Sequence, residues 1–409
     1  MSLIACHDCD LIHGVGPVPE GNIAKCSRCG AVLHQHKRDS LERTLALTVA
    51  GLILFVVANA FPFLGFKLGV QVHETILITG VRELYLQGMW ILATVVLLTT
   101  IVMPAAQMMG LMYVLVPLRL NRIPWKLREV FRFIQFLRPW AMMEVFMLGI
   151  LVSIVKLAKM ATIVPGIAVF AFMALTFVLT ASLAVLDSHS VWERIKIRES
   201  TRGIPVARTH PIACHSCHLL CCSPSQEAHG LTCPRCGTNL HRRKPDSIAR
   251  TWALILAAAV FYIPANVLPI TVVTSLGKKH ADTIISGVIY FISSGMWPIA
   301  LVIFVASVFV PLIKLLALSY LSFSVQRKSR WRPVDRTKIY RMTEVVGRWS
   351  MVDVYVVTIL VALVNLGALA NIEAGPAAVY FCGVAITTMF AAMSFDSRLI
   401  WDQMENKNE

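Results

Sequence analysis

Eight long stretches of apolar sequence constrain the fold of this 409-residue chain more than any other feature. Hydrophobic residues make up 56% of the chain and charged residues only 15%, which lies outside the range of an ordinary soluble domain. A helix that crosses the hydrocarbon core needs roughly 20 apolar residues, and every stretch comes near that length. The sequence therefore predicts eight transmembrane helices, at Ala46–Leu64, Trp90–Val116, Ala141–Ala158, Ile163–Leu186, Trp252–Ile270, Trp297–Phe323, Met351–Ala370 and Ala374–Ser394.

The basic residues lie where a membrane protein would place them. A formal net charge of +15 is compatible with nucleic-acid binding, but two loops hold basic blocks while the intervening loops hold few basic residues. The blocks follow the second and sixth stretches: Arg119, Arg122, Lys126, Arg128, Arg132 and Arg138, then Arg327, Lys328, Arg330, Arg332, Arg336, Lys338 and Arg341. By the positive-inside rule, both termini and the segment between the halves face the cytoplasm. Because topology and anionic lipid headgroups account for this charge, we expect no nucleic-acid partner.

The second half of the chain repeats the first at a nearly constant offset. Cys6-His7-Asp8-Cys9 recurs as Cys214-His215-Ser216-Cys217, and Trp140–Glu144 corresponds to Trp349–Asp353. Each copy contains four apolar stretches, and this even number means that both copies enter the membrane from the same side. The halves are therefore predicted to be parallel repeats, related by an axis along the membrane normal.

Each copy begins with four cysteines in two Cys-x-x-Cys pairs, a spacing typical of zinc ribbons. Four thiolates suit a closed, tetrahedral structural Zn²⁺ site. A cytoplasmic location argues against stable disulfides, and the duplication of the complete set argues against a single redox pair. We predict up to two structural zinc ions, one bound by Cys6, Cys9, Cys26 and Cys29 and one bound by Cys214, Cys217, Cys233 and Cys236. Cys221 and Cys222 are expected to be loop residues, with replacement of a ligand as the less favoured alternative.

These observations predict an all-α polytopic membrane protein. It consists of two parallel tandem repeats of four transmembrane helices, each preceded by a cytoplasmic zinc ribbon. The predicted domains are a first zinc ribbon (1–40), a first transmembrane domain (41–200), a second zinc ribbon (201–245) and a second transmembrane domain (246–409). The segments at the outer ends of the spans are long enough to form small elements outside the membrane.

Four ionisable residues lie within the predicted spans, where a charged side chain costs several kcal/mol and marks a functional candidate. Glu144 and Asp353 occupy equivalent positions in spans three and seven, Lys156 lies late in span three, and Lys314 lies in span six. We expect Asp353 about one turn inside the cytoplasmic boundary. Lys314 falls at a comparable or slightly greater depth, so the sequence predicts that it pairs with Asp353.

A proline gives span six a second unusual feature. Pro311 removes the hydrogen bond to the carbonyl of Ser307, which bends the helix and frees an acceptor. Ser307 and Lys314 lie two turns apart on one face, and this face could line a hydrated path. Ser350 could continue the polar chain into span seven, and Thr387 or Thr388 could continue it into span eight.

Structural roles are the alternative for all of these residues. Lys156 can extend to the outer membrane surface. Glu144 and Asp353 can cap their helices, where the dipole favours a carboxylate. Serine and threonine often mediate helix packing within membranes.

Four strings in the second half carry a resemblance to a known family. They are Pro-Ala-Asn-Val-Leu-Pro-Ile at Pro264–Ile270, Asp-Thr-Ile at Asp282–Ile284, Val-Gly-Arg-Trp-Ser-Met-Val-Asp-Val at Val346–Val354 and Phe-Asp-Ser-Arg-Leu-Ile-Trp-Asp at Phe395–Asp402. With the cysteine tetrads, they resemble the paraquat-inducible protein A family over essentially the whole chain. One departure is Pro139, which stands where the second copy has Arg348.

The resemblance implies a bacterial inner-membrane subunit that works with a periplasmic protein of mammalian-cell-entry (MCE) domains. Such a partner forms a tunnel for lipids across the envelope, and the membrane subunit loads or unloads lipid with energy from the proton motive force. The resemblance also implies a polar network at Lys156, Ser307, Lys314, Ser350 and Thr388, with Asp353 and Glu144 inside matching motifs.

The leading functional hypothesis is therefore a lipid-handling transporter subunit. The alternatives are a scaffold that anchors the tunnel protein without transporting lipid, and a membrane protein of the envelope-stress response. An enzyme is not expected, because no nucleophile–base pair, open metal site or Walker A sequence stands out.

Overall fold

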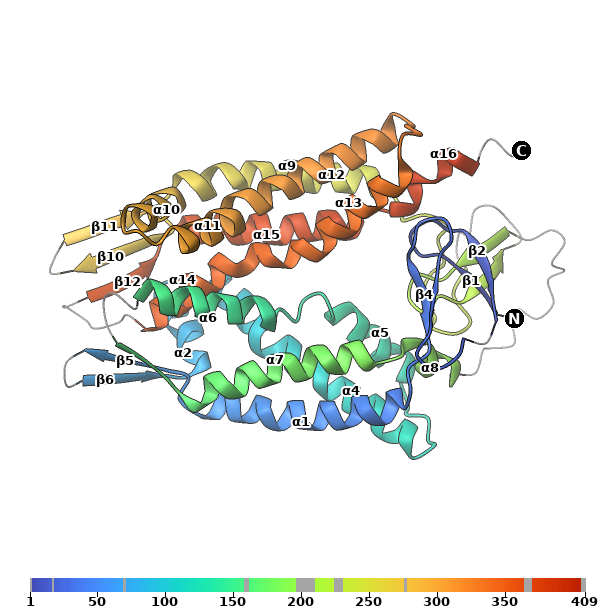
Figure 1. Cartoon of the computed structure of the whole chain (residues 1–409), viewed down its shortest axis with the longest axis horizontal. Helices are drawn as coiled ribbons and strands as arrows, with labels where there is room; N and C mark the ends of the chain where they lie inside the picture. Colours follow the sequence, from blue (N-terminus) through green and yellow to red (C-terminus); the bar gives the residue numbers. More distant parts are fainter. Residues whose placement is uncertain are drawn as a thin grey trace.

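The structure is a computed structural model that describes residues 2–16, 18–68, 71–157, 162–195, 210–223, 231–275, 278–363 and 370–405. It is mostly helical, and its long helices run side by side along the longest axis of the molecule (Figure 1). Small β-sheets lie at one end. The cysteine-containing segments and both chain termini lie at the other end (Figure 1).

The first half begins with two β-hairpins, which we call the first ribbon. Its strands are β1 (Ser2–Ala5), β2 (Ile12–Val15), β3 (Ile23–Lys25) and β4 (Val32–Gln35). There follow α1 (Ser40–Ala60), β5 (Leu64–Leu68), β6 (Gln71–Thr75), α2 (Leu77–Leu86), α3 (Trp90–Leu97), a π-helical turn (Leu98–Val102), α4 (Met103–Arg119), α5 (Leu127–Leu137), α6 (Met143–Leu157), β7 (Thr162–Pro165), α7 (Ile167–Val185) and α8 (Ser188–Glu193).

The second half presents its elements in a closely similar order. The second ribbon contains β8 (His210–Ala213), β9 (Leu220–Ser223) and a bridge between Thr232 and Asn239. There follow α9 (Ser247–Val267), β10 (Thr271–Ser275), β11 (Lys278–Asp282), α10 (Ile284–Ser293), α11 (Trp297–Phe304), a π-helical turn (Val305–Phe309), α12 (Val310–Gln326), α13 (Pro333–Val346), a 3₁₀ turn (Gly347–Met351), α14 (Val352–Leu363), β12 (Ala370–Ala374), α15 (Ala377–Ser394), a 3₁₀ turn (Ser397–Ile400) and α16 (Asp402–Glu405). The boundary predicted between residues 200 and 201 lies outside the described residues.

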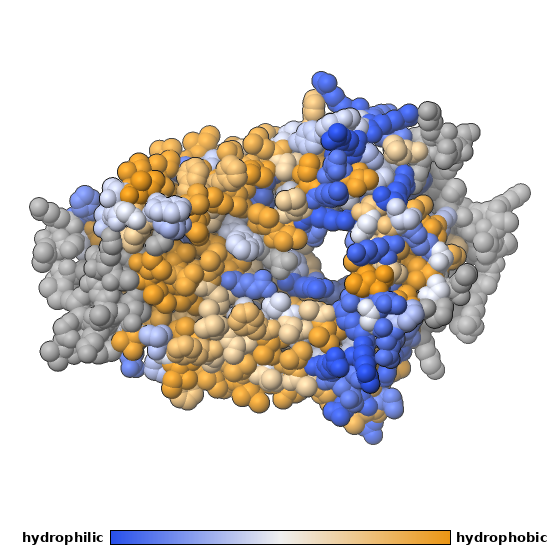
Figure 2. Space-filling view, viewed as in Figure 1, coloured by the Kyte–Doolittle hydropathy of each residue, from blue (hydrophilic) through white to orange (hydrophobic). Residues whose placement is uncertain are grey.

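Seven helical segments in the described part of the chain are long and apolar enough to cross a membrane. They are Ser40–Ala60, Trp90–Arg119, Ile167–Val185, Ser247–Val267, Ala300–Gln326, Pro333–Leu363 and Ala377–Ser394. They correspond to seven of the eight predicted spans, and Figure 2 shows hydrophobic side chains covering much of this region. The third predicted span is α6, which has only 15 described residues, so its crossing of the membrane stays a prediction.

The prediction of an all-α protein is wrong in one respect, because the described chain also contains β-sheets. Besides the ribbon hairpins, two three-stranded antiparallel sheets lie at the end opposite the ribbons, in the orders β6-β5-β7 and β11-β10-β12. Each sheet combines a hairpin after the first helix of its half with a strand that precedes the last long helix. The third strand of each sheet comes from a distant part of the sequence. These strands are short and adjoin apolar stretches, so the sequence contains no separate signal that predicts them.

The two halves pack against each other through α14. This helix lies against α6 and α2 of the first half, and eleven of its twelve residues are buried. The hydroxyl of Tyr355 in α14 donates a buried hydrogen bond to Thr99 Oγ1 at 2.9 Å. A helix that is apolar on all sides is expected at such a central position.

A glycine at the start of the last long helix of each half permits a close backbone approach. A Cβ added at Gly166 would clash with the carbonyl oxygen of Pro62, and one at Gly375 with that of Pro269. We predict that Gly166→Ala and Gly375→Ala each destabilise the fold by about 1–3 kcal/mol, because backbone on both sides must shift. Thermal unfolding in detergent measures this effect. Gly287→Ala is the control, because nothing lies within 4 Å of its added Cβ; an equal loss in that variant would contradict the prediction.

Candidate functional site

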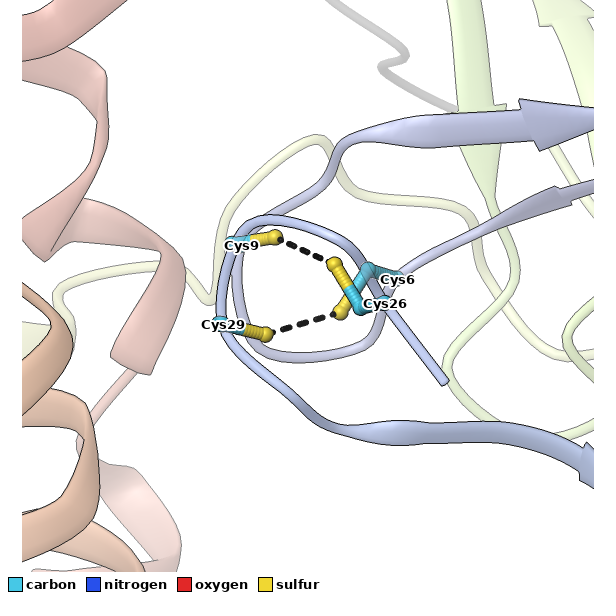
Figure 3. A group of neighbouring side chains, drawn as sticks. All are labelled: Cys6, Cys9, Cys26 and Cys29. Atoms are coloured by element: carbon cyan, nitrogen blue, oxygen red, sulfur yellow. Dashed lines mark hydrogen bonds between the residues drawn. The ribbon is translucent and has the colours of Figure 1, made fainter. Parts of the chain in front are cut away.

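The first ribbon brings its four cysteines together at the turns of its two hairpins. Cys6, Cys9, Cys26 and Cys29 are buried, and their sulfur atoms all lie within 4.8 Å of one another. The Cys6–Cys29 sulfur distance is 3.4 Å and the Cys9–Cys26 distance is 3.5 Å. Figure 3 shows the four sulfurs pointing into one common space.

The second ribbon repeats this arrangement with Cys214, Cys217, Cys233 and Cys236, which are likewise buried within 4.8 Å of one another. The glycine after each second pair has a positive φ, +71° at Gly30 and +74° at Gly237, as expected for these turns. Four buried thiols at this spacing fit a metal ion, so each ribbon could hold one. With all four positions occupied by sulfur, such an ion would have a structural role.

The strand register also corrects the expectation for Cys221. It lies in β9 and pairs with Ile212, just as His13 in β2 pairs with Ile4. His13 Nε2 lies 3.2 Å from Cys26 Sγ, beside the first tetrad. Cys221 is therefore a buried strand residue with a counterpart in the first half. Cys222 also lies in β9, where it pairs with Pro211, so the expectation of loop residues is wrong for both.

Each ribbon packs against the opposite half of the chain. The first ribbon packs against the second half, in a cluster that joins its cysteines to Tyr340, Phe395 and Trp401. Arg341 on α13 forms an ion pair with Asp8 at 2.6 Å, and the guanidinium of Arg28 stacks over Trp401 at 4.5 Å. We call this contact the second-half joint.

The second ribbon packs in turn against the first half. Its cysteines and Ile212 share a cluster with Phe131 of α5 and Trp192 of α8. We call this contact the first-half joint. Trp192 and Trp401 are equivalent positions of the repeat, so each half uses the same tryptophan to hold the ribbon of the other half. Local sequence patterns contain no signal for such an exchange.

The segments that connect each ribbon to its own helices make matching hydrogen bonds. Ser40 donates to Val185 O and Ser247 donates to Ser394 O. Each serine Oγ also accepts from a backbone N–H, that of Asp187 or Asp396. The ribbons are thus attached to both halves, to their own by these short connections and to the other by the joints.

Lys314 lies deep in the second half, and its partners among the described residues are neutral oxygens. It is 1% exposed, and its Nζ donates to Thr388 Oγ1 at 2.8 Å, Gly347 O at 3.2 Å and Ser350 Oγ at 3.4 Å. Gly347 permits this approach, since an added Cβ would lie 3.3 Å from the lysine nitrogen. The structure therefore brings together three of the residues predicted for the polar network.

The predicted pairing of Lys314 with Asp353 is wrong. Asp353 is not among the partners of Lys314. The helical segment that contains span seven begins at Pro333, because α13 continues through a 3₁₀ turn into α14. Its first part is polar and reaches the ribbon through Arg341. Depth alone could not predict the direction in which either side chain points.

The other candidates lie in different surroundings. Ser307 is fully buried in the π-helical turn, and its hydroxyl has no hydrogen-bond partner among the described residues. Asp353 lines a narrow cavity of about 50 Å³ that follows α14 toward Asp282 and Thr283 at the sheet end. Glu144 is exposed and accepts from Thr180 at 2.8 Å. The backbone of Lys156 belongs to α6, but its side chain lies outside the described part of the structure.

The first half lacks the groups that hold Lys314. Its equivalent of the lysine is Gln107, and the positions of Ser350 and Thr388 are occupied by Ala141 and Leu179. Gln107 is fully buried, and neither atom of its amide has a hydrogen-bond partner in the part of the chain that the structure describes. The lysine and its two hydroxyl partners thus occur together in the second half only.

The apolar helices fit a multi-pass membrane protein, and its two ribbons contain buried cysteine groups that could each hold a metal ion. A sequence model of the family described as paraquat-inducible protein A matches residues 41–196 and 248–405, and the chain belongs to this family. It is 33% identical over 413 residues to the intermembrane transport protein PqiA of Escherichia coli strain K12, covering 99% of this chain and 97% of the relative.

Two further relatives match over similar lengths. The lipophilic envelope-spanning tunnel protein A of the same strain is 31% identical over 405 residues, which cover 98% of this chain and 92% of the relative. A probable intermembrane transport protein of Haemophilus influenzae is 29% identical over 409 residues, covering 98% and 95%. No solved structure matches the chain significantly.

Removal of one thiol should release the metal of one ribbon only. We predict that Cys9→Ser and Cys217→Ser each lose one of the two bound metal ions. A tetrahedral site that loses one of its four ligands loses most of its affinity for the metal. Elemental analysis of the purified protein by mass spectrometry measures the content. Cys222→Ser is the control, since this cysteine is exposed and outside both tetrads. Unchanged metal content in the Cys9 and Cys217 variants would contradict the assignment.

The second-half joint should give the stability a dependence on acid. Burial raises the pKa of Asp396, but hydrogen bonds and charge from Arg398 lower it more strongly, to about 2. A lowered carboxylate pKa stabilises the fold above the unfolded pKa near 4, and this contribution disappears as the pH falls through 2. We predict that Asp396→Asn costs about 2 kcal/mol at neutral pH and nothing below pH 2.

Unfolding in detergent across this pH range measures the contribution of Asp396. Asp39→Asn serves as the control, because the side chain of Asp39 is 63% exposed. A constant difference between the Asp396 variant and the unsubstituted chain at every pH would show that the carboxylate charge is not the cause.

Proposed function

We propose that this chain is the inner-membrane subunit of a trans-envelope lipid transport system and works with a periplasmic MCE-domain tunnel protein. The names of its relatives support transport between membranes, and one relative is named for an envelope-spanning tunnel. The substrate is a phospholipid or another lipid. In this proposal both termini and both ribbons lie in the cytoplasm, where the basic loops place them, and the sheets lie in the periplasm.

The burial of Lys314 is the observation that supports coupling of transport to the proton motive force. An ammonium group inside a span is costly, and three neutral oxygens compensate only in part for its lost hydration. Nothing in ordinary helix packing requires a lysine there, because the first half builds the same span with Gln107. We infer that Lys314 takes up and releases a proton as the halves rearrange, driven by the proton motive force.

The surroundings of Lys314 supply a means of rearrangement. The π-helical turn at Val305–Phe309 lies directly before Pro311, whose ring nitrogen cannot donate a hydrogen bond. Such turns often mark functional sites, since helix register can shift there. Ser307 has an unused hydroxyl in this turn, so a water or a moved Lys314 side chain could bind it. Asp353 and its cavity then offer a route toward the periplasmic end, and Glu144 and Lys156 are the corresponding candidates in the first half.

The ribbons are proposed to be structural zinc sites. Four buried thiols and no other ligand favour Zn²⁺, and such a site stabilises its fold without taking part in chemistry. The chain is therefore not proposed to be an enzyme, which agrees with relatives that are named as transport proteins.

A scaffold that only anchors the periplasmic partner is the second candidate function. Its support is the pair of three-stranded sheets, which present a formed surface on the proposed periplasmic side. A scaffold has no use for a buried lysine, so substitution of Lys314 separates the two functions. A role in the envelope-stress response is a further alternative that the same strain assays address.

We predict that Lys314→Met abolishes complementation of a strain that lacks the gene, while membrane insertion and binding of the partner persist. Methionine has a similar length and no charge, so the helix packing is preserved. Growth under envelope stress, together with copurification of the partner and its lipid, measures the outcome. Gln107→Met is the matched control in the first half and should complement, because its amide makes no hydrogen bond in the described structure. Full complementation by the Lys314 variant would favour the scaffold.

A further inference from the structure

The first-half joint encloses a cavity of about 450 Å³. It lies between the two ribbons, α8 and the residue that follows α5, and Figure 1 shows β4 beside α8 at this end of the molecule. Basic and histidine side chains contribute much of its polar lining, namely His34, Lys37, Arg138, His189, His218 and Arg235. The cavity is distinct from Lys314 and from the first cysteine tetrad, and it borders the second tetrad at Cys217.

The second-half joint contains two carboxylates that have no equivalent at the cavity. These carboxylates belong to the first ribbon and neutralise the arginines of the joint. Asp8 pairs with Arg341, and Asp10 pairs with Arg243 and lies 3.9 Å from Arg398. In the second ribbon the equivalent positions are Ser216 and His218, so both of these carboxylates are missing from the first-half joint.

The arginines that those carboxylates bind are retained only in part, because Arg341 corresponds to Arg132 whereas Arg243 and Arg398 correspond to His36 and His189. Other cations are present at this joint. Arg235 corresponds to Arg28, Lys37 corresponds to Lys244, and Arg138 stands where the second half has Gly347. Arg28 stacks over Trp401, whereas Nε of Arg235 is buried and has no hydrogen-bond partner among the residues described. A buried guanidinium nitrogen without a hydrogen-bond acceptor costs folding free energy, which favours a bound group that supplies the acceptor.

Two carboxylates remain at the cavity, and both lie beside His189 rather than beside Arg235. Asp187 caps α8, accepting from the backbone N–H of His189 at 3.0 Å and from Ser190 Oγ at 2.6 Å. Glu193 lies 3.2 Å from the ring of His189. Neither is a hydrogen-bond partner of Arg235 Nε, so this guanidinium has an acceptor position that no described residue fills.

We propose that this cavity binds an anion that carries a phosphate group, in place of the two carboxylates present at the other joint. Arginine and histidine donors suit phosphate oxygens, and arginine can bind them in a bidentate manner. The volume far exceeds the roughly 30 Å³ of one water, so a larger phosphate-bearing group fits. Because α1 begins and α7 ends beside the cavity, the phosphate comes either from a lipid headgroup or from a soluble phosphate ester. This inference does not rest on the proposed transport function.

Calorimetric titration of the purified, metal-loaded full chain with inorganic phosphate tests the site. Arg235→Gln should weaken binding about ten-fold, the effect of losing one charge-assisted hydrogen bond. Arg28→Gln is the matched control, since it changes the equivalent knuckle at the other joint and should leave phosphate affinity unchanged. Metal content is measured in both variants to show that the ribbons remain folded. Equal weakening by both variants would overturn the proposal.

A second variant restores the missing carboxylates. The double substitution Ser216→Asp with His218→Asp rebuilds the acidic pair of the first ribbon in the second, and it should abolish phosphate binding while metal content stays unchanged. Binding that persists in this variant, or phosphate binding that is undetectable in the unsubstituted chain, would overturn the proposal.

The source of the phosphate is separated by reconstitution. In nanodiscs of phosphatidylcholine, added phosphatidylglycerol should weaken the apparent affinity for inorganic phosphate if a lipid headgroup fills the cavity. Unchanged affinity would assign the cavity to a soluble phosphate ester. Both results support an anion site, because each requires that inorganic phosphate binds there in the first place.

Discussion

The cost of leaving polar groups without partners in a dry environment determines most of this structure. Within hydrocarbon, backbone amides must be satisfied inside each segment, so the long apolar stretches are helices and the sheets lie only at the ends. The same cost makes the buried side chains informative. Lys314 obtains three oxygens from Gly347, Ser350 and Thr388, while the amide of Gln107 obtains none in the described part of the first half.

The two halves have kept one framework and changed its polar groups. Hydrogen bonds at the ribbon connections, the glycines at the last long helices and the tryptophans at the joints occur in equivalent places. The differences are concentrated in two regions. The second half alone combines Lys314 with Ser350 and Thr388, whereas the first-half joint alone has lost its acidic pair. Because the two halves present similar elements in a similar order, each half is a reference for the polar groups of the other.

Local patterns made much of the fold predictable. Apolar length predicted seven spans that the structure bears out, and cysteine spacing predicted both tetrads, because these signals depend on neighbouring residues. The third strand of each sheet and the exchange of ribbons could not be predicted in this way, since they depend on contacts between distant segments. Residue depth placed Lys314 and Asp353 at similar levels. It failed to predict their partners because helix packing sets the direction of each side chain.

The exchanged ribbons give the metal sites a structural consequence beyond their own hairpins. The halves meet directly through α14, near the middle of the molecule, and Figure 2 shows an opening between the helices and the ribbon end. At that end, each ribbon is attached to its own half by the short connection at Ser40 or Ser247 and to the other half by a joint. Any movement that separates the halves there must therefore strain or release a joint. The second-half joint contains paired arginines and carboxylates, and the first-half joint lacks two of those carboxylates, so the first-half joint is the one that should open first when its anion site is empty.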